Sequence, residues 1–159
     1  MARLDISNIE WNGILRGNLL EEFKQYASIP DGSRDAMLLS ILKNAILKVQ
    51  EYGDRALIPC TVTQVCRVPP TGVVRLYLGG GDVYGLSNTK SGDFVPFDPL
   101  PGGKLILYSR GIEVRIVFQA KPAEADLIKA RTTILRYATA LYDGEEVETL
   151  NKILSESLC

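Results

Sequence analysis

The chain contains no histidine among its 159 residues, and this absence removes several kinds of catalysis at once. Ser-His-Asp and Cys-His mechanisms need an imidazole as general base, and catalytic zinc is usually held by histidine nitrogens. Lysine, cysteine or carboxylate chemistry remains formally open. None of these residue types forms a familiar catalytic motif in this sequence, so we predict a protein that is not an enzyme and binds no cofactor.

Cysteine is also scarce. The three cysteines, Cys60, Cys66 and Cys159, are odd in number and show no Cys-X-X-Cys spacing, which argues against a disulfide framework. Cys60 and Cys66 are separated by an even number of positions, so in an extended strand both point to the same face as Val62. We interpret both as small core residues, because a thiol pair or a metal site would need further ligands nearby.

The sequence lacks an excess of either charge and lacks long apolar runs. Its 18 basic and 19 acidic residues leave a formal net charge of −1, so no global positive field attracts nucleic-acid phosphates or an anionic membrane. The longest apolar runs fall far short of the roughly 20 residues that span a bilayer. The N-terminus lacks the apolar stretch of a secretory signal, so we expect synthesis in a reducing cytoplasm and no membrane partner.

Helical periodicity dominates the first third of the chain. A short amphipathic helix is expected to begin after Asn18, the predicted N-cap, with Glu21 completing a capping box. Apolar residues then recur at helical spacing over residues 38–52, and Gly53 ends this second helix. The expected buried stripe of the first helix comprises Leu19, Leu20, Phe23 and Tyr26.

Two more helices are predicted at the other end of the chain. Pro122 suits the first position of a helix that runs to Tyr142, and Asp143-Gly144 interrupts the pattern before a last helix over residues 147–158. The expected apolar face of the longer helix comprises Leu127, Ile128, Ile134, Leu135, Ala138, Leu141 and Tyr142.

Between the helices the hydrophobic period changes to two, which indicates strands. We predict strands over residues 58–68 and 74–78, a shorter extended piece over 83–86, and a hairpin formed by 104–108 and 112–118. The triplet Gly79-Gly80-Gly81 superficially suggests a phosphate-binding loop, but it lacks the Lys-Ser/Thr pair and the following helix that such a loop needs. A tight hairpin turn is the better interpretation.

The order of helices, strands and helices, without βαβ alternation, predicts an α+β fold. We expect a helical body of about four helices with a small antiparallel sheet or hairpin subdomain inserted between them. Residues 1–159 would form a single domain, with helices in 1–57, a β-region in 58–120 that contains a long loop over 87–103, and helices in 121–159.

The β-region holds two groups of residues with an alternative reading. Asp82, Asp93 and Asp98 could gather around a divalent cation, although no calcium-loop spacing supports this and solvated loop acids are favoured. The aromatic residues could stack on bases, but they lack the Lys/Arg clusters that track phosphates, so packing is favoured. These aromatic residues are Tyr77, Tyr84, Phe94 and Phe97.

Two segments are candidates for binding other proteins. The stretch over residues 93–101 contains three prolines and several apolar residues, so it either docks on a neighbour or folds back onto its own sheet. The last helix either closes the core or lies in a groove of a partner. The residues predicted for these contacts are Phe94, Val95, Phe97 and Leu100 in the loop and Val147, Leu150, Leu154 and Leu158 in the helix.

Several segments resemble a known family. The helix and its exit, Ala45-Ile46-Leu47-Lys48-Val49-Gln50-Glu51-Tyr52-Gly53-Asp54-Arg55-Ala56-Leu57-Ile58, are similar to those of the head-tail connector (adaptor) proteins of tailed bacteriophages. The strand over 114–120, the helix over 123–142 and the ending Tyr142-Asp143-Gly144-Glu145-Glu146 continue the resemblance.

The resemblance implies a virion structural protein at the head-tail interface, assembled in the host cytoplasm. Copies would form a ring beneath the portal, joined to tail, second adaptor or stopper proteins. DNA would pass through without specific binding. The loop residues are then proposed for contacts between neighbours, and the last helix for docking to the portal. The alternative is a small non-phage ligand-binding or metal-binding domain, or an enzyme, that uses the loop carboxylates.

Overall fold

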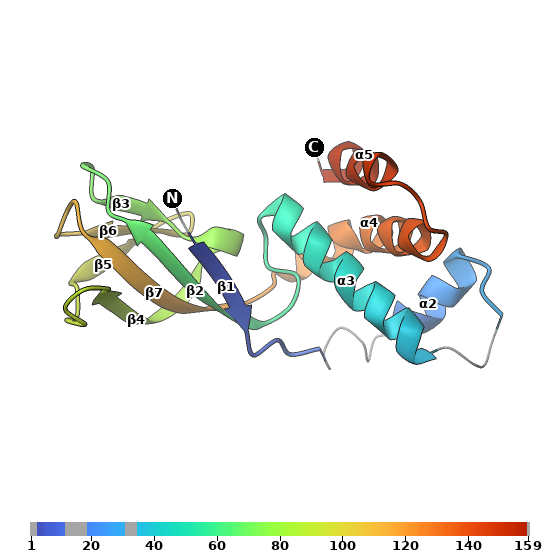
Figure 1. Cartoon of the computed structure of the whole chain (residues 1–159), viewed down its shortest axis with the longest axis horizontal. Coiled ribbons are helices and arrows are strands. Elements are labelled where there is room, and N and C mark those ends of the chain that lie inside the picture. Colours follow the sequence, from blue (N-terminus) through green and yellow to red (C-terminus); the bar gives the residue numbers. More distant parts are fainter. Residues whose placement is uncertain (1–2, 12–18, 31–34, 159) are drawn as a thin grey trace. The chain divides into compact units, whose positions relative to one another are not determined.

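The computed structural model describes residues 3–11, 19–30 and 35–158, with side chains through residue 156. Within this part of the chain, four α-helices and two small antiparallel sheets confirm the predicted α+β class (Figure 1). The chain divides into two compact units, a β-rich unit (Met1–Glu10 and Ile58–Lys121) and a helical unit (Trp11–Leu57 and Pro122–Cys159). That residues 1–159 behave as one domain stays a prediction.

The helical unit is built around its longest helices. It contains α2 (Leu19–Tyr26), α3 (Asp35–Gly53), α4 (Glu124–Tyr142) and α5 (Val147–Leu158). Helix α4 packs against each of the other three, and the rings of Phe23 and Tyr142 meet edge to face with centroids 6.5 Å apart. The most deeply buried apolar residues of this unit are Phe23, Leu38, Leu42, Ala45, Ile46, Val49, Ile134 and Ala138.

The predicted helices are confirmed, with differences at their edges. Tyr26 is half exposed at 49%, and Ile128 is 69% exposed, so both were wrongly assigned to buried faces. Helix α4 begins at Glu124 with Ala123 as N-cap, so Pro122 lies before the helix and not at its first position. Asn18, the predicted cap of the first helix, lies outside the described residues.

Three ion pairs between described residues join helices of this unit, and one of them links Arg136 of α4 to Glu156 of α5 at 3.7 Å. The buried ammonium of Lys24 lies 2.8 Å from the Asp35 carboxylate at the start of α3. The Arg131 guanidinium of α4 donates to both carboxylate oxygens of Glu22 in α2, and this hydrogen bonding holds the pKa of Glu22 below its ordinary value. Because Glu22 and Arg131 are solvent-accessible, we expect this pair to orient α2 more than to stabilise it.

The predicted break between the last two helices is confirmed and has a specific geometry. Gly144 adopts a positive φ of 72° just after α4 ends at Tyr142. The amide of Glu145 donates to the Ala140 carbonyl, and that of Gly144 to the Leu141 carbonyl. This is the Schellman arrangement, in which a left-handed residue satisfies the last carbonyls of a helix.

One sheet of the β-rich unit has four antiparallel strands in the order β1-β2-β7-β4, namely β1 (Arg3–Ser7), β2 (Cys60–Arg67), β7 (Glu113–Ala120) and β4 (Gly81–Asn88). Strand β7 shows the predicted alternation, with its apolar side chains buried at every second position. Strand β1 was missed, because residues 1–57 were expected to hold only helices. Its five residues include Arg3 and Asp5, and its pairing with β2 is nonlocal.

The second sheet has three antiparallel strands in the order β3-β6-β5, namely β3 (Val73–Arg75), β6 (Lys104–Leu107) and β5 (Phe97–Leu100). The predicted hairpin of 104–108 with 112–118 is therefore wrong, because β6 and β7 belong to different sheets. The chain leaves β6 and returns to the first ladder, where Val68 and Ile112 are joined by an amide-carbonyl hydrogen bond. Alternation within each strand was correct, but it does not specify the neighbouring strand.

Two further expectations change in this unit. Residues 87–103 do not form one open loop, since they include β5 and the bridge between Ser87 and Phe94. The strand expected over 74–78 ends at Arg75 and gives way to a short 3₁₀ turn, Tyr77–Gly79. Gly79 and Gly80 have positive φ, as a turn requires, but the strands on either side pair elsewhere, so it is not a hairpin.

We predict that Gly81→Ala destabilises the protein by about 2–3 kcal/mol, because a Cβ there would lie 1.8 Å from the Gln119 carbonyl oxygen and force β4 and β7 apart. Gly85→Ala in the same strand is the matched control. Its Cβ would meet only the Val117 side chain at 3.5 Å, so we expect a change below about 1 kcal/mol. Urea unfolding of both variants checks this, and equal losses would contradict the assigned strand contact.

Candidate protein-interaction surfaces

The turn between β4 and β5 holds an aromatic side chain away from the core. We call residues 86–98 the hairpin, because the chain after the turn bonds back to the end of β4 before it enters β5. The Val95 amide donates to the Leu86 carbonyl at 3.0 Å, and the Asn88 amide donates to the Asp93 carbonyl at 2.9 Å. Val95 is buried at 3% exposure, so its neighbour Phe94 points outward and is 68% exposed. The hairpin therefore presents Phe94 on a backbone fixed on both sides.

The other apolar residues predicted in this segment are partly covered. Phe97 and Leu100 are half-buried, and the rings of Phe94 and Phe97 lie tilted with centroids 6.4 Å apart. The Tyr108 hydroxyl donates to the Asp98 carboxylate, and this bond raises the pKa of Tyr108. Of the four loop residues predicted for contacts, Phe94 is thus the most accessible, while Val95 belongs to the core.

A groove runs along β3, on the side where this strand diverges from β2. Its volume is about 320 Å³. We call it the β3 groove, and it is lined by Gln64, Cys66, Arg67, Pro69, Val73, Val74, Arg75, Leu76 and Tyr77.

A buried glutamine of β2 bonds the backbone on the opposite side of this groove. Gln64 is only 2% exposed, and its amide nitrogen donates to the Arg75 carbonyl at 3.0 Å. Its amide oxygen accepts from the Tyr77 amide at 3.1 Å. Because β3 is an outer strand of its sheet, the backbone on its outer side has no strand partner there, and a side chain of β2 bonds these groups instead. Exposed Arg67 and Arg75 lie at the rim, and Arg67 donates to the Gly111 carbonyl.

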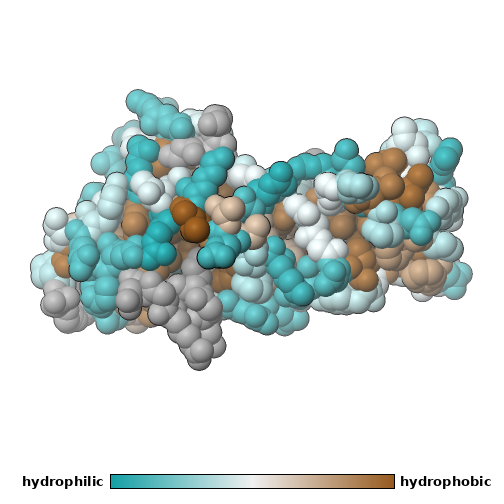
Figure 2. All heavy atoms as spheres, turned by 180° about the vertical axis from the view of Figure 1, so that it is seen from behind, coloured by the Kyte–Doolittle hydropathy of each residue, from teal (hydrophilic) through white to brown (hydrophobic). Residues whose placement is uncertain are grey.

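Hydrophobic residues also gather on the outside of the β-rich unit. Figure 2 shows brown residues collected on the face of this unit seen from behind. The outer row of the three-stranded sheet pairs half-exposed Val73 with half-exposed Ile106. This unit therefore has accessible apolar surface in addition to Phe94.

Helix α5 is mostly an element of the helical core. Leu150 and Leu154 are buried, together with Ile153, because α5 packs on α4. Val147 at the first turn is 70% exposed. The side chain of Leu158 lies outside the described residues. Of the predicted docking residues with described side chains, only Val147 is accessible without unpacking the helix.

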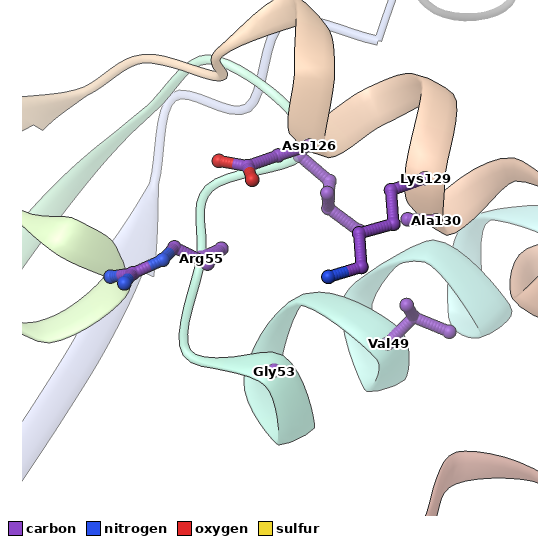
Figure 3. Close-up of a pocket in the computed structure, with 7 residues that line it drawn as sticks. Val49, Gly53, Arg55, Asp126, Lys129 and Ala130 are labelled. Carbon is purple, nitrogen blue, oxygen red and sulfur yellow. The ribbon is translucent and has the colours of Figure 1, made fainter. Parts of the chain in front are cut away.

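The helical unit has a pocket between the end of α3 and the start of α4 (Figure 3). Its volume is about 210 Å³, and Val49 and Ala130 form part of its wall. In Figure 3 the Lys129 ammonium points across the pocket, whereas the Arg55 guanidinium points away from it. Asp126 brings an opposite charge to the lining, so the pocket has no uniform preference for an anion or a cation.

The structure does not gather the loop acids into a cation site. Asp82 lies 3.6 Å from the Lys121 ammonium, and the Asp98 carboxylate accepts a hydrogen bond from the Tyr108 hydroxyl. Among the described residues, no group of three or more Asp, Glu, Cys or His side chains is placed to hold a metal. Burial raises the pKa of the Cys60 and Cys66 thiols, which disfavours the thiolate that a metal or a nucleophilic mechanism needs.

The prediction from sequence missed the β3 groove altogether. The signal was Gln64, a polar residue in phase with Cys60, Val62 and Cys66 on the buried face of β2. A polar residue on an apolar face usually has a specific hydrogen-bonding duty. Here Gln64 bonds backbone groups that a neighbouring strand would otherwise pair with, and no local sequence pattern reveals this role.

Comparison with known proteins identifies a solved structure with a similar fold. No family model and no curated protein matches the chain. A chain in a solved structure described as "Neck of empty GTA particle computed with C6 symmetry" is similar in fold, with a TM-score of 0.63 and 16% sequence identity. The alignment covers 89% of this chain and 84% of that one, so it includes both units. None of the described helices is long and apolar enough to cross a bilayer.

We predict that Gln64→Leu destabilises the protein by about 1–3 kcal/mol, because it leaves the Arg75 carbonyl and the Tyr77 amide without their partner. Thr63→Val, at the neighbouring half-buried position of β2, is the control and should change stability little. Chemical unfolding followed by circular dichroism measures both. If Gln64→Leu were neutral, the glutamine would not be what holds β3.

Proposed function

We propose that this protein is a structural component of the neck of a phage-like particle, where it joins the head to the tail as a ring-forming connector. The observation that carries the proposal is the likeness of fold, over most of both chains, to a chain from the neck of a GTA (gene transfer agent) particle. The resemblance of residues 45–58 and 114–146 to head-tail connector proteins supports the same role independently.

The charge of the chain suits such a position. With a formal net charge of −1, the protein has no overall field that would bind DNA tightly, so a ring of copies would let DNA pass. The neighbouring structure was computed with C6 symmetry, which supports a ring arrangement of this chain also. The expected partners are further copies of the chain, the portal, and tail or stopper proteins.

Docking to the portal is the proposed role of the C-terminal helix. The accessible first turn of α5, with Val147 70% exposed, is the part that can meet a partner while Leu150 and Leu154 hold the helix to its own unit. This narrows the docking surface from the whole apolar stripe to one side of the helix. The buried leucines then contribute to docking by fixing the orientation of α5.

Electron microscopy tests the ring directly. We expect the purified chain, alone or mixed with a candidate portal protein, to give rings or ring-capped portals, and mass spectrometry of purified particles to find the chain in them. The proposal requires that copies of the chain form a closed ring around a channel, so class averages with rotational symmetry are the decisive result. Absence from particles, together with a chain that stays monomeric with every portal tested, would contradict it.

Two substitutions in α5 separate docking from folding. Val147→Asp should leave thermal stability nearly unchanged and reduce portal binding, because it places a charge on the exposed turn. Leu154→Ala should destabilise the chain by about 2–5 kcal/mol, because it opens a cavity at a buried site. Differential scanning fluorimetry and pull-down with portal measure the two effects. Full portal binding by Val147→Asp would exclude this side of α5.

A further inference from the structure

The β-rich unit has an aromatic projection at one edge and an apolar groove at the other. We propose that Phe94 of one copy inserts into the β3 groove of the next copy, as the contact that links copies head to tail. This inference rests on the proposed ring and names the surfaces that form it. Both surfaces belong to the same compact unit, so the contact is set by the internal geometry of that unit.

The two surfaces lie at opposite edges. In the three-stranded sheet β3 and β5 are the outer strands, with β6 between them. In the four-stranded sheet β7 separates β2, which borders the groove, from β4, which leads into the hairpin. Figure 1 shows β3 and β4 on opposite sides of this unit. A donor and an acceptor on opposite edges cannot meet in one chain, but they can connect successive copies.

The projection is already ordered in the single chain. Val95 is anchored in the core, the Ser87–Phe94 bridge joins the hairpin to β4, and the Asn88 amide is bonded to the Asp93 carbonyl. Binding therefore need not order a loop, which is one of the main costs of association. An exposed phenylalanine on a rigid backbone is the kind of residue that dominates interface energies.

The groove matches this side chain in size and lining. A cavity of about 150 Å³ is enough to hold a benzene molecule, so a groove of about 320 Å³ has room for a phenyl ring and its flanking backbone. Its lining includes the apolar residues Val73, Val74, Leu76 and Pro69. Gln64 uses its amide on the backbone of its own chain, so it does not need a polar ligand from outside.

The charges around the two surfaces are complementary. Asp93 and Asp98 flank Phe94 and Phe97, with Lys90 as the cation of the same turn, while Arg67 and Arg75 stand at the rim of the groove. The pocket of the helical unit fits less well. Its lining mixes the acidic Asp126 with the basic Arg55 and Lys129, whereas the charged residues that line the β3 groove, Arg67 and Arg75, are both basic. Electrostatic complementarity therefore favours the β3 groove as the acceptor.

The test uses one variant that lacks the donor and one that blocks the acceptor. Phe94→Ala removes an exposed side chain, and Val73→Arg places a long side chain in the groove from a half-exposed position, so both should fold. By sedimentation and native mass spectrometry, each variant alone should self-associate about tenfold or more weakly than the unmodified chain. Tyr84→Ala, which removes an aromatic residue 61% exposed and outside the contact, is the control and should associate normally.

Mixing the two variants gives the distinguishing result. The Phe94→Ala chain keeps its groove and the Val73→Arg chain keeps its phenylalanine, so one intact contact can form between them. An equimolar mixture should therefore give a heterodimer that does not grow further. A two-fold contact would also pair the two variants, but the unmodified chain would then stop at a dimer, whereas a head-to-tail contact lets it grow beyond a dimer.

Cross-linking covers the case of weak association. With Asp93→Cys beside the donor and Arg75→Cys at the rim of the groove, in a chain whose Cys66 and Cys159 are replaced by serine, a short bis-maleimide should produce a ladder of multimers, and Tyr84→Cys with Arg75→Cys should not. No ladder at about 1 mM chain, where even millimolar contacts are populated, overturns the inference. So does unchanged association of both Phe94→Ala and Val73→Arg.

These outcomes separate the inference from the function on which it rests. If particles contain rings of this protein, and chains with Phe94→Ala still assemble into them, the contact is wrong and the connector role stands. If the contact forms in solution but the protein is absent from particles, the contact stands and the connector role fails.

Discussion

The antiparallel pairing of β2 with β7 is the contact on which the β-rich unit depends. It aligns Cys60 with Ala120 at one end and Arg67 with Glu113 at the other, and it joins segments more than forty residues apart. Strands β1 and β4 then add to its two sides. The strands of the second sheet all lie between Arg67 and Glu113, and within this stretch β4 returns to pair with β7, so the second sheet is tied to this ladder at its two ends and through β4. Cys60 begins β2 after α3, and Ala120 ends β7 before α4.

The β3 groove lies beside a strand that does not join the first sheet, since β3 pairs only within the second sheet. A strand that leaves its neighbour exposes backbone amides and carbonyls, and each one left bare in an apolar setting is costly. Gln64 meets this need from β2 with a single side chain, bonding both the Arg75 carbonyl and the Tyr77 amide. The result is an apolar groove whose polar requirements are met internally, which is the condition for accepting an apolar side chain from outside.

The two surfaces first suggested by the sequence both prove to be partly core. In the hairpin, adjacent residues divide the roles, since Val95 is buried and Phe94 is exposed. In α5 the division runs around the helix, with Leu150 and Leu154 packed inward and Val147 outward. In both cases the buried residue holds the accessible one in a fixed direction. A rigid presentation of this kind suits a protein that must contact neighbours in a repeated geometry.

Much of the local structure followed from the sequence, because helix and strand periods are local properties. The spacing over residues 38–52 predicted α3, the alternation around Val114, Ile116 and Phe118 predicted β7, and the lack of βαβ order predicted the α+β class. The exclusion of histidine-based catalysis and of binding to nucleic acid by overall charge likewise depended on composition alone. What only the tertiary structure decided was which strands are neighbours, that residues 3–7 complete a sheet, and that Gln64 and β3 enclose a groove. These depend on pairings between residues far apart in the chain, and a pattern of period two is the same whichever strand lies beside it.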